Sequence, residues 1–93
     1  GCADPTRSGN KFGQQYYMLD AGMSMEHLIL AAAEQGLGTC WIGGQFDEQT
    51  VKEALGIPEN MRVVALTPLG YPDEDPAPKE RKSLEEMSSR NHW

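Results

Sequence analysis

The stretch YYMLDAGMSMEHLILAAAEQGLGTCWIGGQF, residues 16–46, decides the fold. Small or apolar residues recur in it at steps of three and four: Met18, Gly22, Met25, Ile29, Ala32 and Gly36. This spacing predicts one face of a long helix over 16–35. Leu19, Met23 and Leu30 widen that face beyond half the circumference, which is typical of a helix covered on most of its sides.

Four glycines follow the predicted helix, and they do not form a known phosphate loop. A dinucleotide fingerprint places its glycines between a strand and the helix it opens, whereas these follow a helix, and a P-loop needs a Gly-Lys-Ser/Thr ending. Gly36 and Gly38 are predicted to end the helix and turn the chain. Gly43 and Gly44 leave two alternatives: a simple bend, or backbone N–H groups that approach a flat ligand and stabilise charge on its ring.

The rest of the chain predicts a small α+β domain in three parts. Residues 1–14 are predicted to be a loop, 15–71 the core and 72–93 a solvated C-terminal arm. Within the core we expect three elements: an extended segment over 39–42, a short helix over 46–58 and a buried strand over 62–71. Such a small sheet is marginal by itself. The element count therefore predicts an incomplete domain, or one completed by a second chain.

Local signals define the short helix and the strand more closely. Asp47 is the expected N-cap, and Gly56 with Pro58 closes the helix. Pro68 is expected near a sheet edge or a bulge, because proline cannot donate a hydrogen bond to a neighbouring strand.

Composition narrows the functional classes. The chain has 93 residues, 39% of them hydrophobic, and a net charge of −6, which suits one globular domain. A negative chain argues against nucleic acid and against an anionic membrane surface as partners. No apolar run reaches about 18 residues, no signal peptide is visible, and the first residue is Gly1 rather than Met.

Cysteine and histidine usage points to no metal site. Cys2 and Cys40 are too few for a disulfide framework, and they predict buried or free thiols in a reducing, cytoplasmic compartment. His27 and His92 do not combine with them at a metal-ligand spacing. Cys40 also has no sequence neighbour that would lower the pKa of its thiol, so no catalytic residue is assigned.

The C-terminal arm holds a candidate phosphate site. Lys79 and Arg81 are two residues apart and point the same way in an extended segment, so together they can hold one phosphate, while Lys82 faces elsewhere. The alternative is a charge run that is simply solvated.

Taken in order, four motifs resemble the C-terminal half of the FMN-dependent nitroreductase family. They are DAGMSMEHLILAAAEQGLGTCWIGGQF (20–46), VKEALGIP (51–58), LGYP (69–72) and KERKSLEE (79–86). Each motif alone is loose, but four in register are fairly specific, and together they cover about residues 15–87.

The resemblance implies a fold, a site and a reaction. The fold would be α+β, a central sheet flanked by helices, in a homodimer with the long helix at the interface. Ile42, Gly43 and Gly44 match the family loop beside the flavin ring, and Lys79 and Arg81 match the basic pair on the FMN phosphate. Electrons would pass from NADH or NADPH through FMN to a nitroaromatic, a quinone or a similar small acceptor.

The sequence also departs from the family pattern. Some members place an acid where this chain has Gly43, and residues 1–14 hold no counterpart of the family's N-terminal Arg-Arg-Ser-type phosphate element. Two rival functions therefore remain: a truncated dimerisation or interaction module that has lost FMN, and a flavin- or nucleotide-binding module without turnover.

Overall fold

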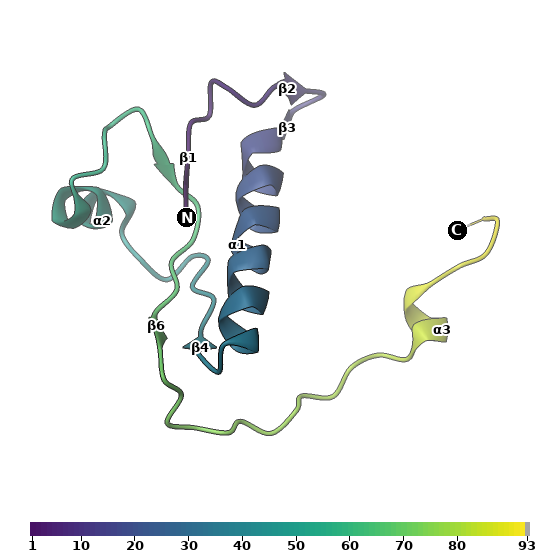
Figure 1. Cartoon of the computed structure of the whole chain (residues 1–93). Helices are drawn as coiled ribbons and strands as arrows, with labels where there is room; N and C mark the ends of the chain where they lie inside the picture. The colour runs from purple at the N-terminus through teal and green to yellow at the C-terminus, as the bar shows by residue number, and fades with distance from the viewer. Residues whose placement is uncertain (93) are drawn as a thin grey trace.

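The computed structural model describes residues 1–92. Its elements, in chain order, are β1 (Cys2–Ala3), β2 (Asn10–Lys11), β3 (Gln14–Gln15), α1 (Tyr16–Glu34), β4 (Gly38–Thr39), α2 (Glu48–Leu55), β5 (Arg62–Val63), β6 (Leu69–Gly70) and α3 (Leu84–Met87). Figure 1 shows α1 standing beside β1, β4 and the chain that runs from β5 to β6, with α2 on the outer side of that chain. The C-terminal segment leaves β6 and passes below α1, away from this body.

The long helix forms where the apolar spacing predicts it. α1 ends at Glu34, and Gly36 adopts the left-handed backbone conformation with φ 74°. The N–H of Leu37 donates to the carbonyl of Ala32 at 2.9 Å, and that of Gly36 to Ala33 at 3.0 Å. These two bonds satisfy carbonyls that the end of a helix would otherwise leave free.

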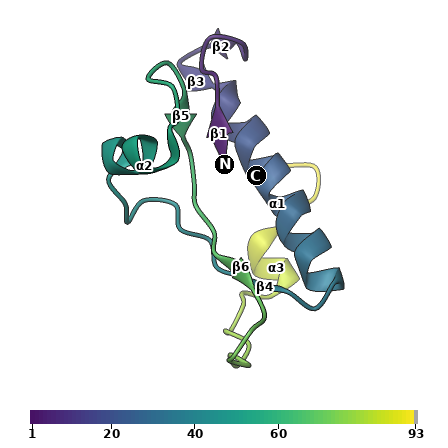
Figure 2. The same ribbon diagram turned by 60° about the vertical axis from the view of Figure 1, so that its left-hand side comes forward.

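A smaller part of the surface of α1 is buried than its apolar composition predicts. Its buried residues form one stripe that packs on β1 and β4, and they are Tyr17, Ala21, Met25 and Ala32. Much of the remaining apolar surface is exposed: Met18 48%, Leu19 56%, Met23 59% and Leu30 58%. A single chain therefore leaves much of the apolar surface of this helix uncovered, which agrees with the predicted incomplete domain. Figure 2 shows the body lying along one side of α1.

The predicted strand over 62–71 is interrupted and only partly buried. Its first part, β5, pairs antiparallel with β1, with Cys2 opposite Val63, and its last part, β6, pairs antiparallel with β4. Between them Leu66 forms an isolated bridge with Ile42. Val63 and Ala65 are buried, at 6% and 0% exposure, whereas the residues after Pro68 are exposed. The expectation of a buried strand thus fails at its C-terminal end.

Two further expectations from the sequence need correction. The predicted loop over 1–14 contains the hairpin β2–β3, whose two turn residues Phe12 and Gly13 both have positive φ. Gly38 does not turn the chain but lies in β4. A Cβ at Gly38 would approach the Cβ of Pro72 to 3.1 Å, so its missing side chain permits close packing across the β4–β6 pair.

The short helix and the arm follow their local signals. Asp47 caps α2 by accepting the N–H of Thr50 at 2.7 Å, and Gly56 ends the helix with φ 64°. The arm over 72–92 is exposed throughout, as its composition predicts. Within it Ser83 and Glu86 form a capping box that starts α3.

One carboxylate fastens α2 to β5. Glu48 accepts two hydrogen bonds from the Nε of Arg62, at 2.9 and 3.2 Å, one from its Nη2 at 2.9 Å, and one from the backbone N–H of Val63 at 2.9 Å. The ammonium of Lys52, a buried charge, lies 3.8 Å away. The hydrogen bonds from Arg62 and Val63, more than the charges, lower the pKa of Glu48 from 4.5 to about 2.

This carboxylate makes stability depend on pH. Because the pKa of Glu48 is lower in the folded state, its contribution is fully present above about 4.5 and is lost as the pH falls toward about 2. Denaturant unfolding over this range should show wild type more stable than Glu48→Gln at neutral pH, with the difference closing in acid. Glu85→Gln, in the exposed helix α3, is the matched control and should leave the pH profile unchanged. A constant gap between wild type and Glu48→Gln would refute the role of the ionised carboxylate.

Candidate functional site

The glycine loop after β4 is held by its first residue. Ile42 exchanges two hydrogen bonds with Leu66: each backbone N–H donates to the other's carbonyl at 2.9 Å. The N–H of Ile42 is therefore occupied within the chain. Its contribution to the predicted site is to position the loop, not to offer a donor.

Gly43 and Gly44 lie just beyond this anchor and are exposed. Within residues 1–92 their N–H groups donate to no backbone or side-chain acceptor. A Cβ at Gly43 would lie 2.8 Å from the indole Nε1 of Trp41, whereas a Cβ at Gly44 would meet nothing within 4 Å. Gly43 thus leaves room for the indole of Trp41, and Gly44 faces open space.

The loop borders an open hollow of about 950 Å³ between α1 and β5. Three of its walls come from the start of α1, from the hairpin β2–β3 and from the segment before α2. Its apolar lining includes Tyr17, Met18, Leu19, Phe46 and Val64. Glu48 and Arg62, already paired with each other, are the charged residues of the lining. The lining is mixed, because Gln14, Gln15, Glu48 and Arg62 also contribute to it. The volume of the hollow lies within the range of small-molecule sites.

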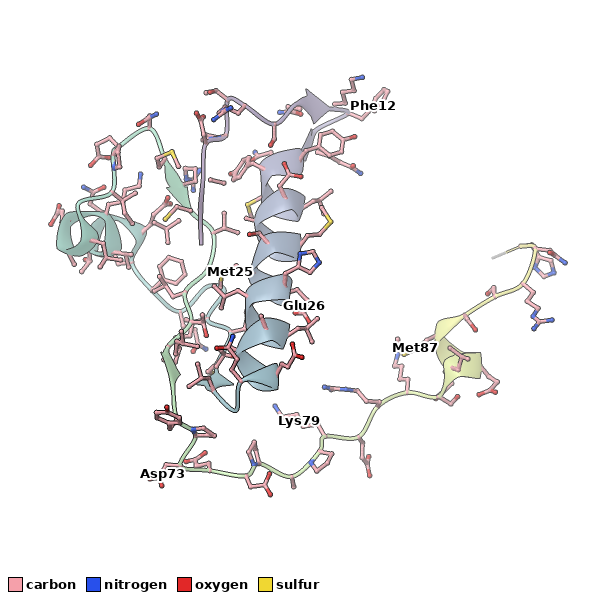
Figure 3. All side chains as sticks on the ribbon, viewed as in Figure 1. Phe12, Met25, Glu26, Asp73, Lys79 and Met87 are labelled. Atoms are coloured by element: carbon pink, nitrogen blue, oxygen red, sulfur yellow. The ribbon has the colours of Figure 1, made fainter. Side chains whose placement is uncertain are left out.

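The basic pair of the arm lies apart from this loop. Figure 3 shows Lys79 on the extended segment below α1, between the labelled Asp73 and Met87. Lys79 and Arg81 are exposed, and neither forms an ion pair or a side-chain hydrogen bond with another residue of 1–92. The structure therefore keeps Ile42, Gly43 and Gly44 together but does not bring the arm's cations to them within one chain.

Sequence reasoning missed the residues that surround the glycine loop. Tyr17, Phe46 and Arg62 come from three segments that only tertiary packing brings to one hollow. No regular spacing along the chain connects these residues, so their proximity could not be predicted from the sequence alone.

Other candidate chemistry is weak. Cys2 and Cys40 are both free and exposed, and no cluster of His, Cys, Asp or Glu within residues 1–92 is arranged to hold a metal ion. In the same part of the chain, no helix combines the length and the apolar character needed to cross a bilayer.

Comparison with known proteins identifies the fold. The model of the Nitroreductase family matches residues 2–71. The NADPH-flavin oxidoreductase of Vibrio harveyi is 41% identical over 76 residues, which are 81% of this chain and 32% of that protein.

Two solved structures agree. A nitroreductase family protein from Clostridium novyi NT has a TM-score of 0.72 and 52% identity, over 76% of this chain and 40% of its own. An NADPH:FMN oxidoreductase from Vibrio harveyi, solved with NAD⁺, has a TM-score of 0.79 and 29% identity, over 99% of this chain and 44% of its own.

The chain spans less than half the length of these three proteins. Its α+β architecture, the match over residues 2–71 and the relatives above 30% identity agree with one another. The chain belongs to the nitroreductase family and has the nitroreductase fold.

Proposed function

We propose that this chain forms part of the FMN site of a nitroreductase-type oxidoreductase. The observation that carries the proposal is the exposed Gly43–Gly44 loop, whose N–H groups have no acceptor within residues 1–92 and whose Gly43 lines an open hollow. The names of similar proteins, an NADPH-flavin oxidoreductase and an NADPH:FMN oxidoreductase, support the choice of cofactor and electron donor.

The loop has the chemistry that a flavin ring requires. Without a side chain at Gly44, the backbone can approach a flat ring closely. Two free N–H dipoles can stabilise negative charge on that ring, and the bridge of Ile42 to Leu66 holds them in place before a ligand arrives. When bound, FMN would accept electrons from NADH or NADPH and deliver them to a nitroaromatic, a quinone or a similar acceptor.

Lys79 and Arg81 are proposed to hold the FMN phosphate. Both side chains are exposed and unpaired within residues 1–92, so no ion pair has to break before they bind an anion. An arginine fork and a lysine point charge are well suited to one phosphate group. Because the arm lies apart from the loop, assembly of the chain must bring the pair to the ring site.

We further propose that the chain works as a homodimer through α1. The exposed apolar residues of this helix would be stabilised by burial against another surface. Leu84 and Met87 on α3 are also exposed, at 75% and 65%. A second copy would bury apolar surface of this kind at both places.

Flavin reduction tests the oxidoreductase function and separates its rivals. The purified chain should take up FMN and show its absorbance band, and the band should bleach when NADH or NADPH is added without oxygen. Colour without bleaching would contradict turnover and favour a flavin-binding module. A chain that takes up no FMN would contradict the proposal as a whole and favour an interaction module.

The phosphate role predicts selective loss of FMN. Replacing Lys79 and Arg81 together by alanine should weaken FMN binding by up to about 3 kcal/mol, the scale of hydrogen bonds to charged groups. Riboflavin, which lacks the phosphate, should bind the double variant and wild type equally. Lys82→Ala is the matched control, and it should leave both affinities unchanged. Equal FMN affinity in the double variant and wild type would remove this role.

The ring role predicts a different pattern. Gly44→Val should weaken FMN and riboflavin alike, because a side chain there would stand between the backbone and the ring. Gly70→Val is the control, since a Cβ at Gly70 also meets nothing within 4 Å, while Gly70 lies in β6 and outside the glycine loop. Titration followed by flavin fluorescence quenching measures both affinities. Normal quenching in Gly44→Val would place the ring elsewhere.

A further inference from the structure

The reason for a glycine at position 43 lies inside the chain. Neither Gly43 nor Gly44 has the left-handed φ that favours glycine, so backbone conformation explains neither residue. A Cβ at Gly43 would lie 2.8 Å from the indole Nε1 of Trp41 and 3.4 Å from its Cδ1, whereas a Cβ at Gly44 would meet nothing within 4 Å. At position 43, therefore, the indole of Trp41 takes the space that a side chain would need.

The backbone on both sides of Trp41 is fixed by hydrogen bonds. The N–H of Cys40 donates to Oγ1 of Thr67 at 3.1 Å, and Ile42 is held by its bridge. Because Ile42 is paired as in a strand, the residues before and after it point to the same face. This alternation agrees with the approach of the indole to Gly43. The indole is therefore directed at Gly43 by the backbone that carries it.

Gly43 connects the indole to the proposed ring site. Gly43 lines the hollow, whereas Trp41 does not, so Trp41 can act on a ligand in the hollow only through the backbone of Gly43. A glycine has more conformational freedom than any other residue, and contact with the indole restricts that freedom. An N–H group that is already held in place loses less entropy when a ligand binds to it.

We propose that Trp41 is a positioning residue of the ring site, whose indole holds the backbone of Gly43 in the orientation that a flavin ring needs. The inference rests on the proposed function and adds to it a residue that does not touch the cofactor. It also gives the two glycines different roles: Gly43 makes room for the indole, and Gly44 makes room for the ring. A side chain at position 43 should therefore harm the site only while the indole is present.

The emission of Trp41 tests the contact without any flavin. The sequence holds two tryptophans, Trp41 and Trp93, so Trp93→Phe leaves Trp41 as the only one. In that background Gly43→Ala should displace the indole toward water, which shifts its emission to longer wavelength and raises its quenching by acrylamide. Gly44→Ala is the matched control and should leave both unchanged, because its Cβ meets no atom. Unchanged emission in Gly43→Ala would show that the indole does not hold Gly43.

Riboflavin affinity of the full chain tests what the contact does. Trp41→Ala and Gly43→Ala should each weaken riboflavin binding about tenfold, and the double variant should bind no more weakly than Trp41→Ala, because both changes remove the same contact. Gly44→Ala should instead cause the same loss with and without the indole. Trp41→Phe keeps an aromatic ring beside Gly43 and should restore most of the affinity that Trp41→Ala loses.

Contrary outcomes separate this inference from the proposed function. If the losses from Trp41→Ala and Gly43→Ala add in the double variant, the two residues act independently and the positioning role is wrong. It is also wrong if Trp41→Phe binds riboflavin as weakly as Trp41→Ala. Both results leave the proposed function standing, because wild type still binds flavin. A wild type that binds no flavin overturns the proposed function and the positioning role together, and the emission of Trp41 then reports on the packing alone.

Discussion

The bridge between Ile42 and Leu66 is the interaction on which the candidate site depends. Its two hydrogen bonds, each 2.9 Å, join the segment after α1 to the strand region after α2. Ala65, next to the bridge, is fully buried, so the anchor sits on the small core rather than on a mobile surface. Gly43 and Gly44 can remain exposed with free N–H groups because the residue before them is fixed.

The second constraint is that α1 has more apolar surface than one chain covers. The stripe of Tyr17, Ala21 and Met25 is buried against the body, while the apolar face around Met23 is exposed. An apolar face in water costs free energy until another surface covers it. The same separation applies to the arm, whose cations lie apart from the glycine loop. The exposed helix face and the separated cations are the two features that the proposed homodimer would account for.

The sequence predicts the features set by neighbouring residues. Asp47 at the start of α2 and the left-handed glycines Gly36 and Gly56 each depend on a few adjacent positions, and each was predicted correctly. Features with a weak local signal, and features that depend on distant residues, were not predicted. The hairpin at Phe12–Gly13 carries a bulky residue at positive φ where turn preferences favour asparagine, so its turn signal is weak. The close approach of Gly38 to Pro72, like the hydrogen bonds of Glu48 to Arg62, arises only when separate segments meet.

The two parts of the proposed cofactor site, the glycine loop and the basic pair, are supported to different degrees. The match over 2–71 includes the glycine loop but stops before Lys79 and Arg81. The loop has its own physical support, in the free N–H groups and the open space at Gly44. Lys79 and Arg81 are exposed and suitably spaced for one phosphate, but no described residue forms an ion pair with them. The proposed ring contact is therefore better supported than the proposed phosphate contact, which would also require the proposed assembly to bring the arm to the loop.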